Sequence, residues 1–374
     1  EHFGFAIPSF PPREVLCDYI TGRVEKAGVK QWVRCSASVA SVTYDDATGK
    51  FSVITVRELE QQTRHTELFD YVICCSGHFS TPNAPQFEGM ETFSGRVMHS
   101  HDFRSAEEFA GKDILVIGTS YSAEDISSQC YKYGVRSVKL SWRTKPMSFH
   151  WPDNFRTVPL LQRVSGRTCF FKDGTSADVD AIIMCTGYQH HFPFLDDSLR
   201  LRTANRRVCD SLHEGVVWPS NPKLMYIGMQ DQWFTFNKFD AQAWYARDVV
   251  LGRIQLPDRA TMDAEHAKWR ATEDALEPTD EALIRHQAEY VQRLLEMTDY
   301  PTFDIDGVVQ RFLEWEHNKH ENIMTFRDCS HSSVFTGAKA PAHHTPWLKA
   351  FDDSIESYVH RNRPEAVAQR QSKL

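Results

Sequence analysis

The sequence lacks the features that mark several other protein classes. None of its nine cysteines forms a C-x-x-C pair, and no apolar run approaches the roughly 20 residues that span a membrane. The net charge of −8 argues against a nucleic-acid partner, because phosphate binding needs a basic face. Cys74, Cys75 and Cys185 lie in apolar runs, so we expect reduced core cysteines of a cytoplasmic protein and no disulfide framework.

What remains is the composition of an ordinary globular protein. Of its residues, 41% are hydrophobic and 25% are charged. The length of 374 residues is enough for one large or two medium-sized domains with a real core. The last three residues, Ser372, Lys373 and Leu374, match a peroxisomal address, which is an alternative to the cytoplasm if the source is eukaryotic.

Two segments of the chain resemble each other. Residues 70–78 read DYVICCSGH and residues 180–188 read DAIIMCTGY. Each ends a predicted β-meander: in the first, strands at 50–56 and 69–75 flank a polar, turn-prone stretch, and in the second the meander turns at K-D-G, 172–174. Such a repeat predicts an α/β fold with two related dinucleotide-binding domains.

The second copy opens with its own strand, loop and helix, at residues 114–126 (ILVIGTSYSAEDI). For the first copy, residues 1–50 predict only an extended stretch, a helix at 13–27 and a strand at 38–44, without a glycine-rich turn. We therefore expect the given chain to lack the first βαβ unit of its first domain.

The loop at 118–123 is a modified dinucleotide-binding turn, because it reads G-x-S-x-x-A where G-x-G-x-x-G is usual. Gly118 suits the tight turn, the Ser120 hydroxyl can donate to phosphate, and Ala123 is an accepted variant at the third position. A helix starting near Ser122 would offer free N–H groups to an anion. Taken alone, the motif fits a cofactor site and a plain strand–turn–helix equally well.

The end of the next predicted strand, 135–146 (VRSVKLSWRTKP), favours a cofactor site. An NAD site has Asp or Glu at this place, whereas this chain has Arg143, Thr144 and Lys145. A cationic fork with a hydroxyl suits a 2′-phosphate, which predicts NADP(H) over NAD(H). The alternative is a solvated basic turn.

Residues 93–103 (FSGRVMHSHDF) fit F-x-G-x-x-x-H-x-x-x-[YF] and resemble the fingerprint of flavin-containing monooxygenases, at Phe93, Gly95, His99 and Phe103. The related Baeyer–Villiger enzymes carry Trp in place of Phe103. Within the family, the resemblance is to the bacterial group that oxidises trimethylamine. It extends over nearly the whole chain, through SFPPREVLCDYI, GHFSTPNAP, GTSYSAEDISSQCYKYG, CTGYQHHFPFL, MQDQWFTFNKFDAQAWYARD and ENIMTFRD.

The resemblance implies two Rossmann-like domains, with the NADP domain inserted into the FAD domain. Residues 1–84 and 196–374 would form the FAD-binding domain, including C-terminal helices and a tail, and residues 85–195 the NADP-binding domain. The implied cofactors are FAD and NADP(H). NADPH would reduce the flavin, O2 would add at its C4a atom, and the peroxide would oxidise trimethylamine, or a similar soft amine or sulfide. The implied partners are this methylated amine and O2, with room for a homodimer.

The resemblance also implies roles for residues of the nucleotide site. Tyr121 and Ser122 match loop positions that contact NADP, and Tyr121 also lies in the substrate vicinity. Arg327 matches a position that reaches NADP. The positions matched in this site are Gly118, Ser120, Tyr121, Ser122, Arg143, Thr144 and Arg327, of which Ser120, Arg143 and Thr144 lie at the phosphates.

For the flavin, Gln232 and Thr235 match ring contacts, and the backbone at Val39 matches an adenine contact. Asp240 and Gln242 would open a helix with Asp240 as its N-cap, and the positive helix end would stabilise charge on the reduced ring. Trp233 could form an aromatic wall with its neighbouring Phe side chains, attracting a methylated ammonium by cation–π interaction. The alternative is a core aromatic cluster beside the flavin.

Two family segments are not in the chain: the first G-x-G-x-x-G, which holds the FAD pyrophosphate, and a W-S-N segment whose Asn stabilises the peroxyflavin. Both would precede Glu1, so no catalytic residue is assigned. An alternative function is therefore a nucleotide-binding module without catalysis. A flavin disulfide reductase would need a spaced cysteine pair, whereas Cys74 and Cys75 are adjacent. The H-x-H at 99–101 and the H-H at 190–191 lack further ligand spacing, and we expect no metal site.

Overall fold

The computed structural model describes residues 6–11, 13–57, 63–203, 206–208 and 211–341. The chain divides into two units. Unit 1 comprises Glu1–Gln31, Pro82–Gly187 and Glu314–Leu374, and unit 2 comprises Trp32–Thr81 and Tyr188–Leu313. The C-terminal tripeptide that matches a peroxisomal address lies outside the described residues. Among the helices that are described, none has the length and apolar character needed to cross a membrane.

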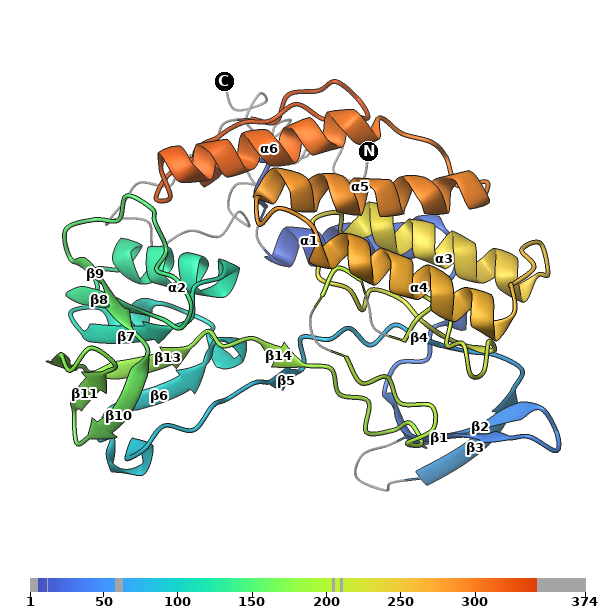
Figure 1. Cartoon of the computed structure of the whole chain (residues 1–374), viewed down its shortest axis with the longest axis horizontal. Helices are drawn as coiled ribbons and strands as arrows, with labels where there is room; N and C mark the ends of the chain where they lie inside the picture. Colours follow the sequence, from blue (N-terminus) through green and yellow to red (C-terminus); the bar gives the residue numbers. More distant parts are fainter. Residues whose placement is uncertain (1–5, 12, 58–62, 204–205, 209–210, 342–374) are drawn as a thin grey trace, which may run out of the picture. The chain divides into compact units, whose positions relative to one another are not determined.

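Unit 1 is built on a parallel sheet of five strands in the order β6-β13-β7-β8-β9 (Figure 1). Strand β7 is central, and its residues 114–117 are at most 2% exposed, as expected for a parallel strand covered on both faces. The strands of this sheet are β6 (Arg96–His99), β7 (Asp113–Ile117), β8 (Ser137–Trp142), β9 (Phe155–Pro159) and β13 (Ala181–Met184).

The strand order reverses between β7 and β13. From β7 the chain continues outward through β8 and β9, and then returns as β13 on the other side of β7, where Met184 pairs with Ile117. In open α/β sheets, ligands bind at the carboxyl ends of the strands where such a reversal occurs. The predicted nucleotide loop follows β7 directly and therefore begins at this point of the sheet.

Smaller elements complete unit 1. The predicted helix at 13–27 is confirmed as α1, and the predicted hairpin turn at 172–174 is confirmed between β11 and β12, with Gly174 at φ +82°. Helix α6 begins in unit 2 and ends in unit 1. These elements are α1 (Arg13–Lys26), α2 (Tyr121–Lys132), β10 (Leu161–Ser165), β11 (Thr168–Phe171), β12 (Ser176–Asp178), α6 (Ile305–Glu321), and the 3-10 turns η2 (Met90–Thr92), η3 (Ser100–Asp102), η4 (Glu107–Phe109) and η5 (Phe326–Asp328).

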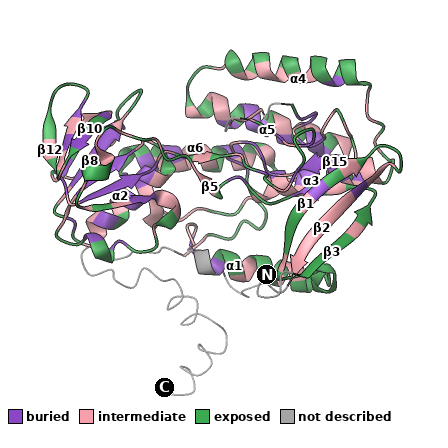
Figure 2. Cartoon of the chain, turned by 90° about the horizontal axis from the view of Figure 1, so that it is seen from below, coloured by how far each residue is buried: buried purple, intermediate pink, exposed green. Residues whose placement is uncertain are grey.

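Unit 2 combines an antiparallel sheet, β1-β2-β3, with a short parallel pair, β4 and β15, and with helices. Helix α4 is the most exposed of these helices, because Met262 is its one buried residue (Figure 2). The elements are η1 (Lys30–Trp32, at the unit boundary), β1 (Ala37–Asp45), β2 (Lys50–Arg57), β3 (Thr63–Phe69), β4 (Val72–Cys74), β15 (Leu224–Tyr226), α3 (Phe236–Val250), α4 (Arg259–Asp274) and α5 (Asp280–Met297), and the links β5 (Thr81–Pro82) and β14 (Tyr188–Gln189).

One expectation about unit 2 was wrong. Part of the polar stretch predicted as a turn between the strands at 50–56 and 69–75 is the strand β3, TRHTELF. It pairs with β2 along its full length, from Phe51 opposite Phe69 to Arg57 opposite Thr63. Pairing with a neighbouring strand outweighs the weak β-propensity of these polar residues, and no local pattern reports it.

The sequence repeat is also a structural repeat. Its two apolar segments form β4 and β13, and each of these strands has a parallel neighbour, β15 or β7. Each strand leads to a glycine in the left-handed region, Gly77 at φ +71° and Gly187 at φ +82°. Both copies therefore end a parallel strand at the kind of sheet edge where nucleotides bind.

Candidate cofactor-binding sites

The loop between β7 and α2 requires its glycine. Gly118 has φ +128°, and a Cβ atom there would lie 2.2 Å from the carbonyl oxygen of Cys185, which follows the neighbouring strand β13. Its N–H donates to the carbonyl of Ser141 at 3.0 Å. Ala123, at the third position of the motif, is fully buried between helix and sheet. The two small residues therefore let the loop lie tightly against the sheet edge.

Helix α2 presents an open N-terminus at this edge. It begins at Tyr121, one residue before the predicted start near Ser122. Its N-cap, Ser120, is exposed, has extended backbone, and makes no capping hydrogen bond with its side chain. The hydroxyl and the positive helix end together suit an anion such as a phosphate.

The end of β8 adds positive charge beside this loop. Strands β7 and β8 are paired neighbours, with Ile117 opposite Ser141, so the turn at 143–145 follows the same sheet edge as the loop. Arg143, Thr144 and Lys145 are all exposed. Within the described parts of the chain, neither Arg143 nor Lys145 forms an ion pair. Two cations without a protein carboxylate fit a phosphate-bearing ligand.

Two further predicted nucleotide residues lie on the α2 side of unit 1. Tyr121 is 41% exposed and stacks on Trp315, with ring centroids 6.1 Å apart. Arg327, in η5, pairs with Asp125 of α2, and its guanidinium carbon lies 4.5 Å from the centre of the Phe326 ring. Arg327 is therefore placed beside the helix that opens the nucleotide loop.

The fingerprint residues have a structural role in unit 1. A Cβ at Gly95 would lie 2.3 Å from the carbonyl oxygen of Asp180, the residue before β13. The Nδ1 atom of His99, at the end of β6, accepts from the N–H of His101 at 3.0 Å. Phe103 stacks nearly parallel on the buried Phe109. The fingerprint, with Phe93 beside Gly95, thus fixes the edge strand β6 against β13.

In unit 2, the predicted flavin residue Gln232 lies within a loop that is held by a side chain of α5, and Thr235 follows this loop. The side chain of Gln287 on α5 accepts from the N–H groups of Trp233 and Phe234, at 2.5 and 2.8 Å, and donates to the carbonyl of Asp231 at 2.8 Å. Next to this clamp, the Oε1 atom of Gln232 is buried and has no hydrogen-bond partner among the described residues. A buried acceptor without a donor is costly, so it fits a ligand with an N–H group, such as the imide of a flavin ring.

The predicted N-cap role of Asp240 is wrong. Helix α3 begins at Phe236, with Thr235 as its N-cap, and the N–H of Phe239 already donates to the carbonyl of Thr235. Asp240 therefore lies inside the helix, where its carboxylate accepts from the hydroxyl of Tyr300 at 3.4 Å. The positive end of α3 consequently lies next to Thr235, closer along the chain to Gln232 than the sequence predicted.

Gln242 is fully buried and holds the preceding loop from within. Its Oε1 accepts from the N–H of Gly228 at 2.9 Å, and its Nε2 donates to Gln230 Oε1 and to the Tyr290 hydroxyl, both at 2.8 Å. These three hydrogen bonds make Gln242 a support of the loop at 228–232. Sequence reasoning missed Gln230, Gln287 and Tyr290, because contacts between residues about 50 positions apart leave no local pattern.

The predicted adenine contact at Val39 and the predicted aromatic wall at Trp233 lie in different surroundings. Val39 is 40% exposed and adjoins an irregularity of β1 between Val39 and Ser41. Trp233 and Phe234 are buried, and their ring centroids lie 5.9 and 5.3 Å from that of Phe312. For these two rings the packing supports the core-cluster alternative over an open aromatic wall.

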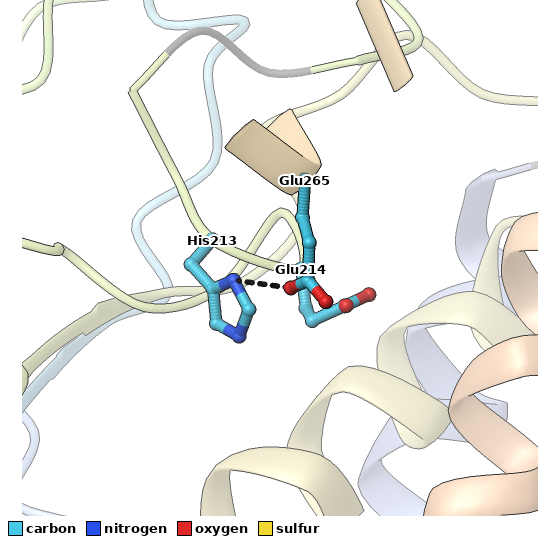
Figure 3. Close-up of side chains that lie close together, drawn as sticks. All are labelled: His213, Glu214 and Glu265. Atoms are coloured by element: carbon cyan, nitrogen blue, oxygen red, sulfur yellow. Dashed lines mark ion pairs between the residues drawn. The ribbon is translucent and has the colours of Figure 1, made fainter. Parts of the chain in front are cut away.

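One cluster in unit 2 resembles a metal site. His213, Glu214 and Glu265 have ligand atoms within 4.8 Å of one another, and His213 Nδ1 lies 3.6 Å from Glu265 Oε2 (Figure 3). However, the guanidinium of Arg293 binds the Glu214 carboxylate, with Nε 3.0 and 3.1 Å from its two oxygens. Because a cation already occupies this carboxylate, we interpret the cluster as an ion-pair clamp that ties α4 and α5 to the turn at 213–217.

Comparison with known proteins gives the family. The model of the family "Flavin-binding monooxygenase-like" matches residues 3–147 and 156–306. The trimethylamine monooxygenase of Roseovarius sp. is 58% identical over 359 residues, covering 96% of this chain and 80% of that protein. The protein of the same name from Methylocella silvestris is 55% identical over 369 residues, covering 99% and 81%.

A solved structure agrees. The crystal structure of Tmm from Pelagibacter sp. matches with a TM-score of 0.91 at 48% identity, covering 96% of this chain and 80% of that one. The predicted α/β fold with two dinucleotide-binding domains, and the predicted family, are confirmed. The chain belongs to the flavin-binding monooxygenase-like family.

Proposed function

We propose that the chain is an NADPH- and O2-dependent flavin monooxygenase that converts trimethylamine to its N-oxide. The observation that carries the cofactor part is the nucleotide loop of unit 1. There an open helix N-terminus and two cations, which pair with no carboxylate of the described residues, follow adjacent strands. The substrate part is supported by the relatives that are 55% and 58% identical, both of which are named trimethylamine monooxygenase.

The reaction balances with one amine, one NADPH, one proton and one O2. One oxygen atom bonds to the lone pair of the nitrogen, the other leaves as water, and NADPH becomes NADP+. Bound FAD supplies the chemistry that passes the electron pair of NADPH to O2. The protein contributes binding, orientation and exclusion of water, and it needs no metal ion for this reaction.

In unit 1, the N–H groups at the start of α2 and the Ser120 hydroxyl hold the phosphates that link the two nucleotides. Arg143 and Thr144 hold the 2′-phosphate of NADP(H), and Arg143 is the main source of discrimination against NAD(H). Gly118 lets the loop lie against the residue that follows β13, because a side chain there would collide with the Cys185 carbonyl. Arg327 supports α2 through Asp125 and reaches the nucleotide from that side.

In unit 2, the buried Oε1 of Gln232 accepts from the flavin imide, and Thr235 at the start of α3 contributes the positive helix end. The backbone at Val39 contacts adenine. Trp233 and Phe234 keep water from the ring. Unit 1 thus holds NADP(H) and unit 2 holds FAD. The sequence-based boundaries at 84/85 and 195/196, the homodimer and the cytoplasmic location stay predictions.

The test is to express the chain together with its upstream coding region, purify the protein, measure its flavin content, and follow NADPH oxidation with and without trimethylamine. We expect bound FAD, amine-dependent oxidation of NADPH, and much slower oxidation of NADH. A chain that carries no flavin but binds NADP+ would be a nucleotide-binding module and would contradict the proposed activity. Flavin-loaded chain that oxidises NADPH at the same rate with and without the amine would contradict the proposed substrate.

A further inference from the structure

A buried lysine lies beneath the nucleotide loop. Lys319, in the last turn of α6, is 4% exposed, and its ammonium lies 3.0 Å from Glu316 Oε1 and 3.6 Å from Glu124 Oε2. A charged lysine is rarely buried to this extent unless it is paired. Three aromatic rings also surround its ammonium, with centroids at 4.8 Å for Tyr121 and 5.6 Å for both Phe149 and Trp315.

This cluster connects the C-terminal end of α6 to the start of α2 within unit 1. Tyr121 is the first residue of α2, and Glu124 lies one turn further along the helix. The Tyr121 ring is stacked on Trp315 and is attracted to the Lys319 ammonium, while 41% of the residue stays exposed. A cation–π contact with a desolvated ammonium is stronger than one at the surface. The ring is therefore held by charge at the position where the loop meets solvent.

We propose that Lys319 is a positioning residue for the nicotinamide nucleotide: it fixes Tyr121 and the first turn of α2, and thereby sets the affinity for NADP(H). The inference rests on the proposed function, because it assumes that this loop binds the nucleotide. Lys319 does not touch the ligand in this proposal and acts through the Tyr121 ring.

The same cluster makes nucleotide affinity depend on pH. Burial raises the pKa of the Glu124 carboxyl to about 7, against the attraction of Lys319. The other charged groups that face it are Glu316 on α6, Asp125 on α2 and Arg327 in η5. Ionised Glu124 places a negative charge in the first turns of the helix that would receive the phosphates. Its repulsion is absent below the pKa and develops as the pH rises through it.

The experiment measures the dissociation constant of NADP+ for the purified chain and its variants. Lys319→Met should raise this constant roughly tenfold, because Tyr121 loses its cation. Removing Lys319 alone also leaves Glu316 uncompensated, so the double variant Lys319→Met with Glu316→Gln restores the charge balance of the pair. The double variant should still bind roughly tenfold more weakly. Recovery of wild-type affinity in the double variant would show a merely structural effect and overturn the proposal.

A matched control is Lys112→Met. The Lys112 ammonium also lies over an aromatic ring of unit 1, that of Phe109 at 5.9 Å, but at the start of β7 and so at the opposite sheet edge. This variant should bind NADP+ as the wild type does. A weakening equal to that of Lys319→Met would mean that the effect is not specific to the loop.

The pH profile gives a second readout. Between pH 6 and 8, the NADP+ dissociation constant of the wild type should rise roughly threefold more than that of Glu124→Gln, by repulsion from one ionised carboxylate. The 2′-phosphate also titrates near pH 6, but it contributes equally to both proteins. Parallel profiles would overturn the role of Glu124. Wild-type chain that binds no NADP+ would refute the proposed function itself, whereas equal binding by wild type and Lys319→Met would refute only the positioning role.

Discussion

The nucleotide loop of unit 1 and the flavin loop of unit 2 are held in place by different means. In unit 1 the turn at Gly118, which opens the loop, is fixed by main-chain contacts at the end of a parallel sheet: Gly118 donates to the Ser141 carbonyl and lies close against Cys185. In unit 2 the loop at 228–234 is held by side chains of two helices, chiefly Gln242 of α3, which follows the loop, and Gln287 of α5. In unit 1, strand order and main-chain contacts are enough to position the turn. In unit 2, buried amide side chains have to hold the loop in place.

The two constructions should fail in different ways. A turn fixed by main-chain contacts should tolerate most changes of neighbouring side chains. It should not tolerate a side chain at the glycine that touches the next strand end. A loop fixed by buried amides tolerates small changes of shape but not the loss of a hydrogen-bond partner, because an unpaired buried polar group carries its full desolvation cost. The following predictions test this contrast, from the largest expected effect to the smallest.

The largest effect should come from Gly118→Val. Its side chain would meet the Cys185 carbonyl and would force Val into the left-handed region, so the free energy of unfolding should fall by about 4 kcal/mol and NADP+ binding should be lost. Urea denaturation and NADP+ titration measure both. The control is Gly111→Val, where φ is +70° but nothing lies within 4 Å of the added Cβ. Gly111→Val should lower the free energy of unfolding by only about 1–3 kcal/mol, through backbone strain. An equal loss of stability in the two variants would show that contact with the Cys185 carbonyl is not the cause.

Gln242→Leu should break the other construction. It removes three buried hydrogen bonds, and the Gly228 N–H loses its acceptor, so we expect a loss of about 2–4 kcal/mol of unfolding free energy. Flavin content should fall, while NADP+ affinity should change less than about twofold, because the loop of unit 1 is built without this side chain. Spectroscopic flavin determination and NADP+ titration measure the two effects.

The control for this variant is Gln292→Leu, which removes an exposed amide on α5 that donates to Glu296. It should change stability by less than about 0.5 kcal/mol. If Gln242→Leu weakened NADP+ binding as much as flavin binding, the two loops would not be independent constructions.

Lowering the pH should destabilise unit 2 through His78, whose ring is hydrogen-bonded to the loop at Gly228. Burial lowers its pKa to about 4, opposed by the hydrogen bond between its Nδ1 and the Gly228 carbonyl. The folded chain therefore keeps His78 neutral where the unfolded chain, with a pKa of 6.5, takes up a proton. Its contribution to stability is complete above pH 6.5 and is lost as the pH falls towards 4, by up to about 3 kcal/mol.

His78→Gln should flatten this acid dependence in urea denaturation at a series of pH values from 7 to 4. His150→Gln, which changes an exposed histidine of unit 1, should leave the profile as in the wild type. An unchanged slope in His78→Gln would show that His78 is not the titrating group.

The smallest effect should come from Arg143→Ala, which alters one exposed contact and leaves the loop intact. It should weaken NADPH binding more than NADH binding, by about 1.5–3 kcal/mol, as expected for a charge-assisted hydrogen bond. Lys172→Ala, in an exposed hairpin turn of the same unit, should not discriminate between the two. Equal weakening of NADPH and NADH would show that Arg143 does not recognise the 2′-phosphate.

The local structure around the candidate site in unit 1 could be predicted well because its signals are local in the sequence. A buried strand, a glycine turn and a helix start are adjacent at 114–123, and the next strand end carries Arg143. Parallel pairing then brings two adjacent strand ends to one edge by geometry alone. The helix start was misplaced by one residue, from Ser122 to Tyr121, because Ser120 and Ser122 are both acceptable caps.

The site in unit 2 could be predicted only in part. Gln232 and Thr235 are candidate flavin contacts by resemblance alone. The N-cap was wrongly placed at Asp240, because an acidic residue before an apolar helical pattern is the usual signal. Gln287 and Tyr290, like Lys319 in unit 1, contact residues that lie 48 or more positions away, and their roles depend on tertiary packing. A single sequence contains no pattern that reports such contacts.

The central claim is that this chain transfers one oxygen atom from O2 to trimethylamine at the expense of NADPH. The most direct measurement supplies isotopically labelled O2 and follows the label in the product by mass spectrometry. The account predicts labelled trimethylamine N-oxide, with one labelled atom for each NADPH oxidised. Oxidation of NADPH that yields hydrogen peroxide and no labelled N-oxide would contradict it.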